Sequence, residues 1–335
     1  MKCWHAQIRP GFRLIALALV LVLVLTACGP ANQSGPAATT SRNAPGATGE
    51  RAAIGQPLQV VATTTIVGDV VRNIAGDKVQ LTVLMPPGAD PHSFEPTPQD
   101  VAAIANADIV FINGVGLEKF LEPLLENAGG DARTVSVSEG VATREFAGEE
   151  EHAGEDEHEG DDPHVWFNPL NVVVWTDNIE KTLSELDPNN AEAYRSSAEA
   201  YKQQLAELDN WIQGQVTGIP ENRRTLVVDH ALFGYFADRY GFEQVGAVIP
   251  GVSTMAEPSA QEIAALEETM RALQVPAIFV GTTVNPTLAE RVAEDTGTRL
   301  VRVFTDSLSP PDGPASSYLA LMRYDVSAFV DAFSQ

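Results

Sequence analysis

The chain is poor in cysteine and in positively charged side chains, and both shortages exclude classes of function. Only two of its 335 residues are cysteine, Cys3 and Cys28. Because both stand near the N-terminus, the rest of the chain has no thiol for a disulfide or for a metal–thiolate site. Lysine and arginine number 21 against 45 acidic residues, which gives a formal net charge of −24. Such a chain repels nucleic acid and anionic lipid headgroups and attracts cations.

Residues 1–27 have the pattern of a secretion signal that ends at a cysteine. Three basic residues come first, and the apolar run Leu14–Leu25 that follows is too short to cross a bilayer unaided. Small residues then precede Cys28, as in the lipobox of bacterial lipoproteins. We therefore expect cleavage before Cys28 and lipid on its thiol. The protein would then be anchored at the outer face of the cytoplasmic membrane, or in the periplasm.

The remaining chain divides into a tether and two lobes. Residues 28–56 are rich in Ala, Gly, Pro, Ser and Thr and lack apolar periodicity, which indicates a flexible tether. Strand and helix patterns alternate over 57–187 and again over 218–335, with one long helical pattern, 188–217, between them. Apolar strands that alternate with helices indicate mainly parallel sheets. The expected fold class is α/β, with two lobes joined by one long rigid linking helix.

Periodicity predicts the individual elements. Eight runs rich in Val and Ile predict strands at Leu58–Ala62, Val79–Leu84, Asp108–Asn113, Thr134–Val137, Thr225–Val228, Gln244–Ile249, Ala277–Val280 and Leu300–Phe304. Helical patterns occur at Ile66–Ala75, Pro98–Ala105, Leu117–Asn127, Ala231–Tyr240, Ser259–Leu273 and Thr287–Thr296. In the linking helix, the residues that step by three or four are Tyr194, Ala198, Tyr201, Leu205, Leu208, Ile212 and Val216. They form one apolar stripe on a helix of about 28 residues, roughly 42 Å long.

Histidine is scarce after Cys28, and two of the five such residues follow predicted strands. His92 lies in a proline-rich loop after the strand that ends at Leu84, and His230 directly follows Asp229 at the end of a strand. Open α/β sheets bind ligands beyond the carboxyl ends of their strands. Each histidine, taken alone, is also compatible with an ordinary surface position.

A third histidine and an aspartate complete a candidate metal site. His164 precedes Trp166 and Phe167, which would bury one side of its ring, and Asp306 follows the last predicted strand. Three imidazoles and one carboxylate, two from each half of the chain, would form a tetrahedral nitrogen and oxygen site. This donor set suits Zn²⁺, whereas Mn²⁺ prefers more oxygen ligands. Four protein ligands leave no position for a reacting water, so the set is typical of a carrier or structural site.

The residues before His164 form an acidic, histidine-bearing run. From Gly148 to His164 there are nine acidic residues, three histidines and no basic residue. We expect a disordered loop over 147–162. Within it, His152 and His158 are candidate accessory ligands that collect metal weakly.

Several ordered motifs resemble the zinc/manganese substrate-binding lipoproteins of bacterial ABC importers. The resemblance runs from about Leu58 to Phe333, and its main stretches are Pro87–Pro96, Asp162–Trp166, Asp229–Phe236, Ile249–Ser253, Ala256–Ser259, Phe304–Leu308 and Tyr318–Tyr324. It implies two α/β lobes, a rigid linking helix and a metal held between the lobes by His92, His164, His230 and Asp306. In zinc-binding members a similar acidic loop precedes the Asp-Pro-His motif.

The chain differs from some members of this family at two places. Members often carry a glutamate directly after the strand that matches Ala277–Val280, whereas Gly281, Thr282 and Thr283 follow it here. Some manganese-binding members carry a carboxylate where this chain has His230. The histidine favours Zn²⁺, with Mn²⁺ as the alternative.

These patterns favour a binding protein over an enzyme. As a receptor, the chain would deliver its metal to a permease and an ATPase on separate chains, because it contains neither a P-loop nor a transmembrane bundle. We expect a monomer that binds the membrane through its lipid and does not bind nucleic acid. A metal-dependent hydrolase is the second hypothesis, although no HExxH motif is present. A surface adhesin is the third, with no repeat or stalk to support it.

Overall fold

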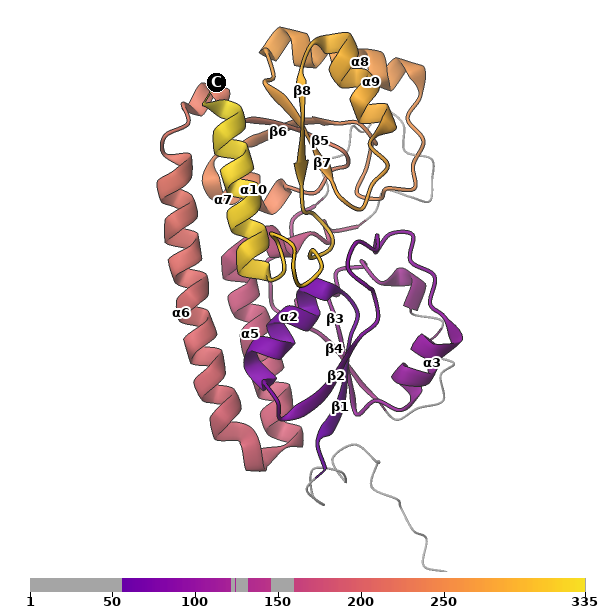
Figure 1. Cartoon of the computed structure of the whole chain (residues 1–335), viewed down its shortest axis with the longest axis vertical. Coiled ribbons are helices and arrows are strands. Elements are labelled where there is room, and N and C mark those ends of the chain that lie inside the picture. The colour runs from indigo at the N-terminus through magenta and orange to yellow at the C-terminus, as the bar shows by residue number, and fades with distance from the viewer. Residues whose placement is uncertain (1–55, 122–123, 125–131, 146–159, 335) are drawn as a thin grey trace, which may run out of the picture. The chain divides into compact units, whose positions relative to one another are not determined.

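The computed structural model describes residues 56–121, 124, 132–145 and 160–334 (Figure 1). The expected signal, almost all of the tether, the lipidation site Cys28 and the accessory residues His152 and His158 lie outside the described residues. All four candidate metal ligands lie within them.

The first lobe is built on a parallel sheet of four strands in the order β2-β1-β3-β4. The strands are β1 (Leu58–Ala62), β2 (Val79–Val83), β3 (Ile109–Ile112) and β4 (Arg133–Ser136). Helix α2 (Thr65–Ala75) packs on one face of this sheet and α3 (Pro98–Ala105) on the other (Figure 1). Because both faces are covered, the central strands carry apolar side chains at nearly every position.

The second lobe repeats this arrangement, with strand order β6-β5-β7-β8. Its strands are β5 (Thr225–Val228), β6 (Glu243–Ala247), β7 (Ala277–Gly281) and β8 (Arg299–Val303), and its helices are α7 (Gly234–Tyr240), α8 (Ala260–Leu273) and α9 (Thr287–Thr296). In each lobe the first strand along the chain lies between the second and the third. The direction in which successive strands are added to the sheet therefore reverses beside it. Loops at the carboxyl ends of such strands form the usual ligand crevice of open α/β sheets.

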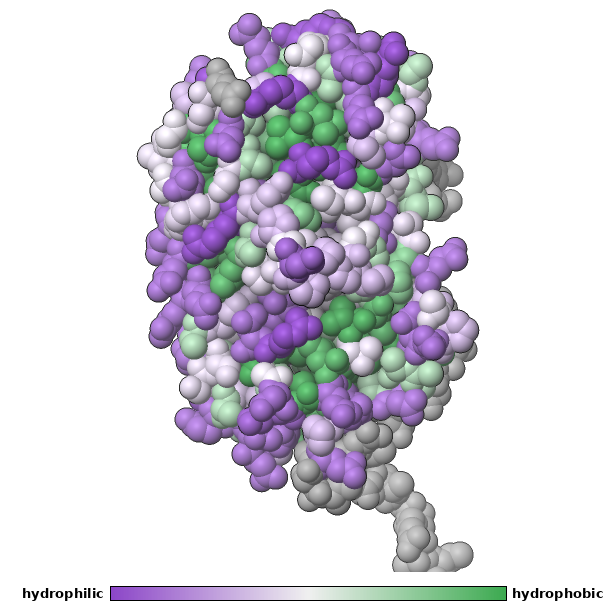
Figure 2. Space-filling model, viewed as in Figure 1, coloured by the Kyte–Doolittle hydropathy of each residue, from purple (hydrophilic) through white to green (hydrophobic). Residues whose placement is uncertain are grey.

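Three long helices connect and brace the lobes. Helices α5 (Pro169–Leu186) and α6 (Ala191–Val216) pack on each other, and α6 also contacts α2 of the first lobe and α10 (Tyr318–Phe333) at the end of the chain. At 26 residues, α6 is about 39 Å long. The predicted apolar stripe of α6 is buried throughout, while Figure 2 shows mostly hydrophilic side chains along the edge that α6 forms. Among the described residues, no helix has the length and apolar character needed to span a membrane.

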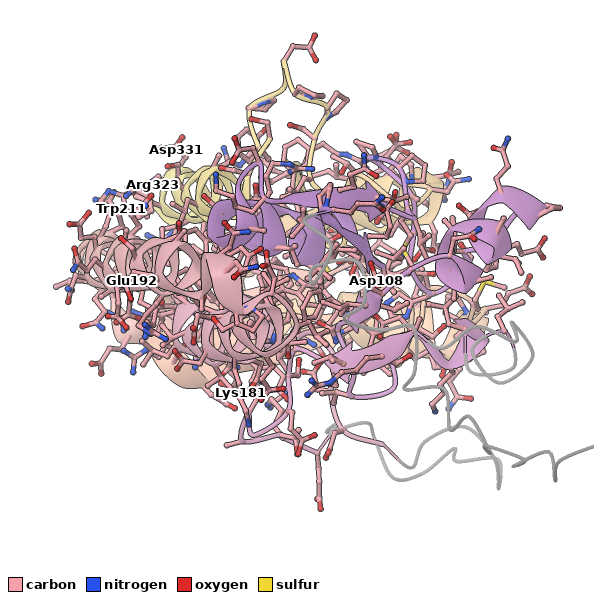
Figure 3. All side chains as sticks on the ribbon, turned by 90° about the horizontal axis from the view of Figure 1, so that it is seen from below. Asp108, Lys181, Glu192, Trp211, Arg323 and Asp331 are labelled. Carbon is pink, nitrogen blue, oxygen red and sulfur yellow. The ribbon has the colours of Figure 1, made fainter. Side chains whose placement is uncertain are left out.

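The contact between α6 and α10 also includes a polar pair near the surface. Arg323 of α10 lies over the ring of Trp211 of α6, 4.8 Å from its centroid (Figure 3). A guanidinium over an indole face is attracted by the ring quadrupole. This pair adds to the apolar contacts that hold the C-terminal helix against the brace.

The predicted fold class is confirmed, and most predicted element bounds agree with the structure to within about two residues. Two differences stand out. The helices α5 and α10 were not predicted, and α7 begins at Gly234 instead of Ala231. Residues 122–123 and 125–127 of the predicted helix Leu117–Asn127 lie outside the described residues, and Lys119–Leu121 forms a 3₁₀ turn. The run of β-branched residues in α5 obscures its helical period. In α10 the apolar spacing is regular and could have been recognised.

One apolar core cluster extends from the first lobe through the helices to the second lobe, and each lobe has a further, separate cluster. In the second lobe the shared cluster centres on Phe329 of α10, which is fully buried. Its ring lies 4.7 Å from that of Phe279 on β7 and 5.4 Å from that of Phe236 on α7, measured between centroids. The helix α10 is therefore anchored to the sheet and to α7 by one aromatic cluster.

We expect Phe329→Ala to lower the free energy of unfolding by about 3–5 kcal/mol, because it removes a buried ring and leaves a cavity. Urea denaturation of the full chain would measure the loss. Tyr324→Ala on the same helix is the control, since Tyr324 is 36% exposed, and its loss should be much smaller. Equal losses in the two variants would contradict the central position of Phe329.

Candidate metal centre

His92 is held by a loop that is fastened to the opposite lobe. Its backbone N–H donates to Asp90 Oδ1 at 2.9 Å, and Asp90 Oδ2 accepts the hydroxyl of Thr254 in the second lobe at 2.5 Å. Two residues before Asp90, the N–H of Gly88 donates to Ser307 Oγ in the second lobe at 2.8 Å. Gly88 has a φ of +85°, a conformation that favours glycine. The position of His92 therefore depends on both lobes.

His164 is oriented by the aspartate two residues before it. Asp162 Oδ1 accepts both the backbone N–H of His164, at 3.0 Å, and its ring Nδ1–H, at 2.9 Å. The Trp166 ring lies edge-on to the imidazole, with centroids 5.3 Å apart, and its Nε1–H donates to the carbonyl of Thr305. With Nδ1 occupied as a donor, the imidazole presents the lone pair of Nε2.

His230 has an equivalent carboxylate, supplied by the residue directly before it. Asp229 Oδ1 accepts the backbone N–H of His230 at 2.7 Å and its Nδ1–H at 3.0 Å. The other oxygen, Oδ2, accepts the N–H of Gly281 at 2.6 Å. A Cβ at position 281 would lie 2.9 Å from that oxygen and would collide with the hydroxyl of Thr305. Position 281 therefore has no room for a side chain, and the glutamate that family members often carry there would not fit.

Asp306 follows β8 and presents a single free oxygen to the site. Its Oδ2 accepts the hydroxyl of Thr305 at 2.6 Å and that of Thr283 at 3.2 Å. Its Oδ1 lies 3.7 Å from Nε2 of His164 and 3.9 Å from Nε2 of His230. Both distances are too long for hydrogen bonds and are compatible with two ligands of one ion.

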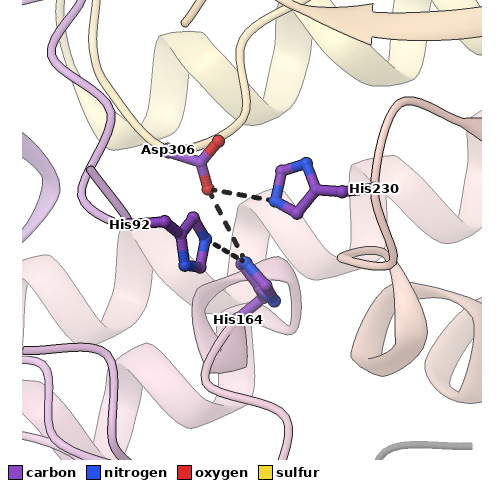
Figure 4. Close-up of side chains that lie close together, drawn as sticks. All are labelled: His92, His164, His230 and Asp306. Carbon is purple, nitrogen blue, oxygen red and sulfur yellow. Dashed lines mark hydrogen bonds and ion pairs between the residues drawn. The ribbon is translucent and has the colours of Figure 1, made fainter. Parts of the chain in front are cut away.

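The structure brings the four candidate ligands to one point (Figure 4). One donor atom from each of His92, His164, His230 and Asp306 lies within 4.8 Å of the others. Nε2 of His92 and Nε2 of His164 are 3.3 Å apart, and the three imidazole centroids are separated by 5.2–5.3 Å. Among the described residues this is the only group of three or more such side chains with metal-binding spacing.

Two unsatisfied atoms indicate that the group fits a cation. His230 Nε2 and Asp306 Oδ1 are buried and have no hydrogen-bond partner. A buried polar atom without a partner costs about 1–3 kcal/mol, so such atoms are uncommon unless a ligand satisfies them. Three Nε2 lone pairs and one carboxylate oxygen that point to a shared centre would all be satisfied by a single ion.

Burial and mutual charge shift the pKa values of the cluster in opposite directions. Burial, followed by the charges of His164 and His230, lowers the pKa of His92 to about 3. Burial would also lower the pKa of His230, but the carboxylates of Asp229 and Asp306 outweigh it and raise that pKa to about 9. The metal-free cluster therefore holds a proton on His230 at neutral pH, and that proton competes with a metal ion.

The sequence reasoning identified the four converging residues and missed the groups that orient them. These groups are Asp162, Asp229, Thr283 and Thr305. A signal for the two aspartates was present, because each stands one or two residues before a candidate ligand. The two threonines have no such signal, because Thr283 reaches Asp306 only through the pairing of β7 with β8.

We expect His92→Ala, His164→Ala and His230→Ala each to weaken the binding of one divalent ion at least tenfold, or about 1.4 kcal/mol. Each variant removes one imidazole of the convergent set. Competition with a chromophoric chelator would measure the change. His158→Ala, which leaves the four converging residues intact, is the control. Wild-type affinity in any two of the three variants would exclude this ligand set.

Metal affinity should rise about tenfold per pH unit between pH 6 and 8, because binding displaces one proton from an imidazole whose pKa is about 9. Raising the pH removes the competing proton, so the metal affinity increases with pH. Titrations at three pH values would measure the slope. In Asp229→Asn the slope should become shallower, since the carboxylate that raises the His230 pKa is lost. A flat profile in the wild type would argue against imidazole ligands.

The chain is similar to a known protein family over most of its length. A profile of the family described as zinc-uptake complex component A, periplasmic, matches residues 60–332. The manganese-binding lipoprotein MntA of Halalkalibacterium halodurans is 35% identical over 285 residues, which cover 84% of this chain and 90% of the relative. The manganese ABC transporter substrate-binding lipoprotein PsaA of Streptococcus mitis is 34% identical over 291 residues, covering 85% and 92%.

Solved structures with the same fold include metal-binding proteins of two other bacteria. The periplasmic zinc-binding protein TroA of Treponema pallidum superposes with a TM-score of 0.76 at 29% identity, covering 83% of this chain and 100% of that one. The Mn-bound periplasmic metal-binding protein of Candidatus Liberibacter asiaticus has a TM-score of 0.72 at 28% identity, covering 82% and 98%. Since the profile matches most of the chain, the protein belongs to the zinc-uptake complex component A family, whose members are metal-binding receptors of ABC importers and not enzymes.

Proposed function

We propose that the protein is a lipid-anchored zinc receptor. In this proposal Cys28 carries the lipid, and a monomer at the outer face of the cytoplasmic membrane binds one Zn²⁺ through His92, His164, His230 and Asp306. The ion is then delivered to a permease and an ATPase on separate chains. His152 and His158 act as accessory ligands that collect metal weakly. The observation that carries the proposal is the convergence of three imidazole nitrogens and one carboxylate oxygen at a buried point.

The donor set supports Zn²⁺ over Mn²⁺. Imidazole is a ligand of intermediate softness that suits zinc, and zinc accepts four ligands in a tetrahedron. Manganese prefers carboxylate, carbonyl and water oxygens. Both lone-pair regions of Asp306 Oδ2 are engaged by the hydroxyls of Thr283 and Thr305. The cluster therefore offers three nitrogens and one readily available oxygen, which is a poor supply for manganese.

Manganese is the second candidate, and the relatives supply the reason. MntA and PsaA, both about one-third identical to this chain, are named for manganese. One of the similar solved structures is Mn-bound and another, of the same bacterium, is Cd-bound. These names support a divalent transition metal as cargo, and the choice between the two metals rests on the donor set of this chain.

Delivery requires the buried ion to become accessible. His164, His230 and Asp306 are at most 2% exposed, whereas His92 is only partly buried. His92 and His164 come from the first lobe, and His230 and Asp306 come from the second. Separating the lobes would therefore divide the ligand set. The lobes share an apolar core next to α6 but are joined by hydrogen bonds at the His92 loop. Opening would therefore begin at the His92 loop and pivot about the core.

In competition experiments, we expect the wild-type protein to bind Zn²⁺ at least roughly a hundredfold more tightly than Mn²⁺, or about 2.7 kcal/mol. His230→Glu should reduce this ratio about tenfold, because it exchanges a nitrogen donor for an oxygen donor. His230→Ala is the control, since it should weaken the binding of both metals without favouring manganese. Equal affinities for the two metals in the wild type would contradict the zinc assignment and favour the manganese receptor.

A further inference from the structure

Arg144 lies behind one of the candidate ligands and is not part of the metal cluster. Its Nη1–H donates to Asp162 Oδ2 at 3.2 Å, and its Nε–H donates to Asp238 Oδ2 at 2.9 Å. Its guanidinium carbon lies 5.9 Å from the centroid of the Tyr235 ring. Asp162 belongs to the first lobe, whereas Tyr235 and Asp238 belong to α7 of the second. The arginine thus bridges the two lobes.

Asp162 divides its two oxygens between this arginine and the imidazole of His164. Oδ1 accepts the backbone N–H and the Nδ1–H of His164, while Oδ2 accepts Arg144. The Asp162 side chain is only 2% exposed. A buried carboxylate without a positive partner is costly, so the arginine stabilises the ionised form that orients the imidazole. An effect of Arg144 on the metal would therefore pass through Asp162.

Further contacts hold Arg144 and Asp162 in place. The backbone N–H of Arg144 donates to the Tyr235 hydroxyl, which in turn donates to the carbonyl of Asp162 at 2.9 Å. A Cβ at Gly234 would overlap the guanidinium and lie 2.8 Å from Asp162 Oδ2. Because Gly234, the first residue of α7, has no side chain, the Arg144 guanidinium has room to reach the Asp162 carboxylate.

The second imidazole with an aspartate partner is held differently. Asp229, which orients His230, is held in turn by the N–H of Gly281 in the same lobe. Asp162 is held by an arginine whose other side-chain contacts, with Asp238 and Tyr235, are in the opposite lobe. Of these two histidines, only His164 is thus oriented by contacts that require both lobes.

We propose that Arg144 is a positioning residue for metal capture, which orients His164 through Asp162 and links that orientation to the seating of α7 against the first lobe. The proposal rests on the proposed receptor function and adds a residue outside the ligand set. When the lobes separate, Asp162 loses its support from α7, and His164 becomes a poorer ligand. Closure of the lobes and completion of the ligand set are then one event.

A double-mutant cycle on the full chain tests the proposal, with zinc affinity measured by chelator competition. Arg144→Met should weaken binding about tenfold, because residues that orient a ligand typically contribute ten- to a hundredfold. Asp162→Asn should weaken it at least as much. The double variant should be no weaker than Asp162→Asn alone, since the arginine acts through that carboxylate. Asp238→Asn should cost about threefold, as expected for a partly exposed ion pair.

Two further variants distinguish positioning from simple stabilisation. Arg133→Met is the matched control, because it removes an arginine that pairs with Glu185 at 2.7 Å far from the cluster, and it should leave zinc affinity unchanged. Gly234→Ala should reproduce the effect of Arg144→Met without a change of charge. If Arg144→Met fails to fold by circular dichroism, Gly234→Ala and Arg144→Lys carry the test, and Arg144→Lys should recover part of the affinity.

Three results would overturn the proposal. Wild-type zinc affinity in Arg144→Met would exclude a positioning role, and additive losses in the double variant would mean that the arginine acts on another group. An unchanged zinc affinity in Asp238→Asn would mean that the contact between Arg144 and α7 does not contribute to metal capture. If the wild type prefers Mn²⁺, the zinc assignment fails, yet the same cycle run with Mn²⁺ still tests Arg144.

Discussion

Side chains from four distant segments can meet at one buried point only if the carboxyl ends of the two sheets face each other. In a parallel sheet all the strands end at the same edge, so every loop that follows a strand is near every other. His92 follows β2, His230 follows β5 and Asp306 follows β8, while His164 stands at the start of the chain segment that leads into α5. The remainder of the fold, including the α6 brace, keeps these two edges opposed.

This convergence creates an electrostatic problem that the protein solves with carboxylates. Three imidazoles whose centroids lie within 5.3 Å of one another cannot all carry the second proton that makes them cationic, and burial further disfavours the charged forms. Asp162 and Asp229 each accept an Nδ1–H, so that Nε2 of both rings faces the shared centre and can bind a cation once the competing proton on His230 has left. The cluster is thus prepared for a cation before one arrives, and the acidity of the whole chain favours its approach.

The lobes are joined in two chemically different ways, and the difference bears on how a bound ion could leave. Along α6 the joint is apolar and continuous, which resists large rotations. Around the cluster, hydrogen bonds and ion pairs such as Thr254 to Asp90 and Arg144 to Asp238 stand beside the packing of Phe167 on Phe233, whose ring centroids are 4.4 Å apart. Polar contacts exchange readily with water, so separation at the His92 loop, which hydrogen bonds join to the second lobe, costs less than separation along the apolar core.

The sequence alone determined the strands, the long helix and the chemical type of the site, because each depends on local pattern. Apolar runs of four or five residues produced β1 and β5 with their observed bounds, and the three-and-four spacing located the buried stripe of α6. Three scarce histidines near element ends, taken together with Asp306, predicted the candidate metal cluster. Only the tertiary structure decided which partners orient these ligands. The contacts of Thr283 with Asp306 and of Arg144 with Asp162 and Asp238 join residues that are 23, 18 and 94 positions apart. Such contacts arise from strand pairing and lobe packing, which leave no local period in the sequence.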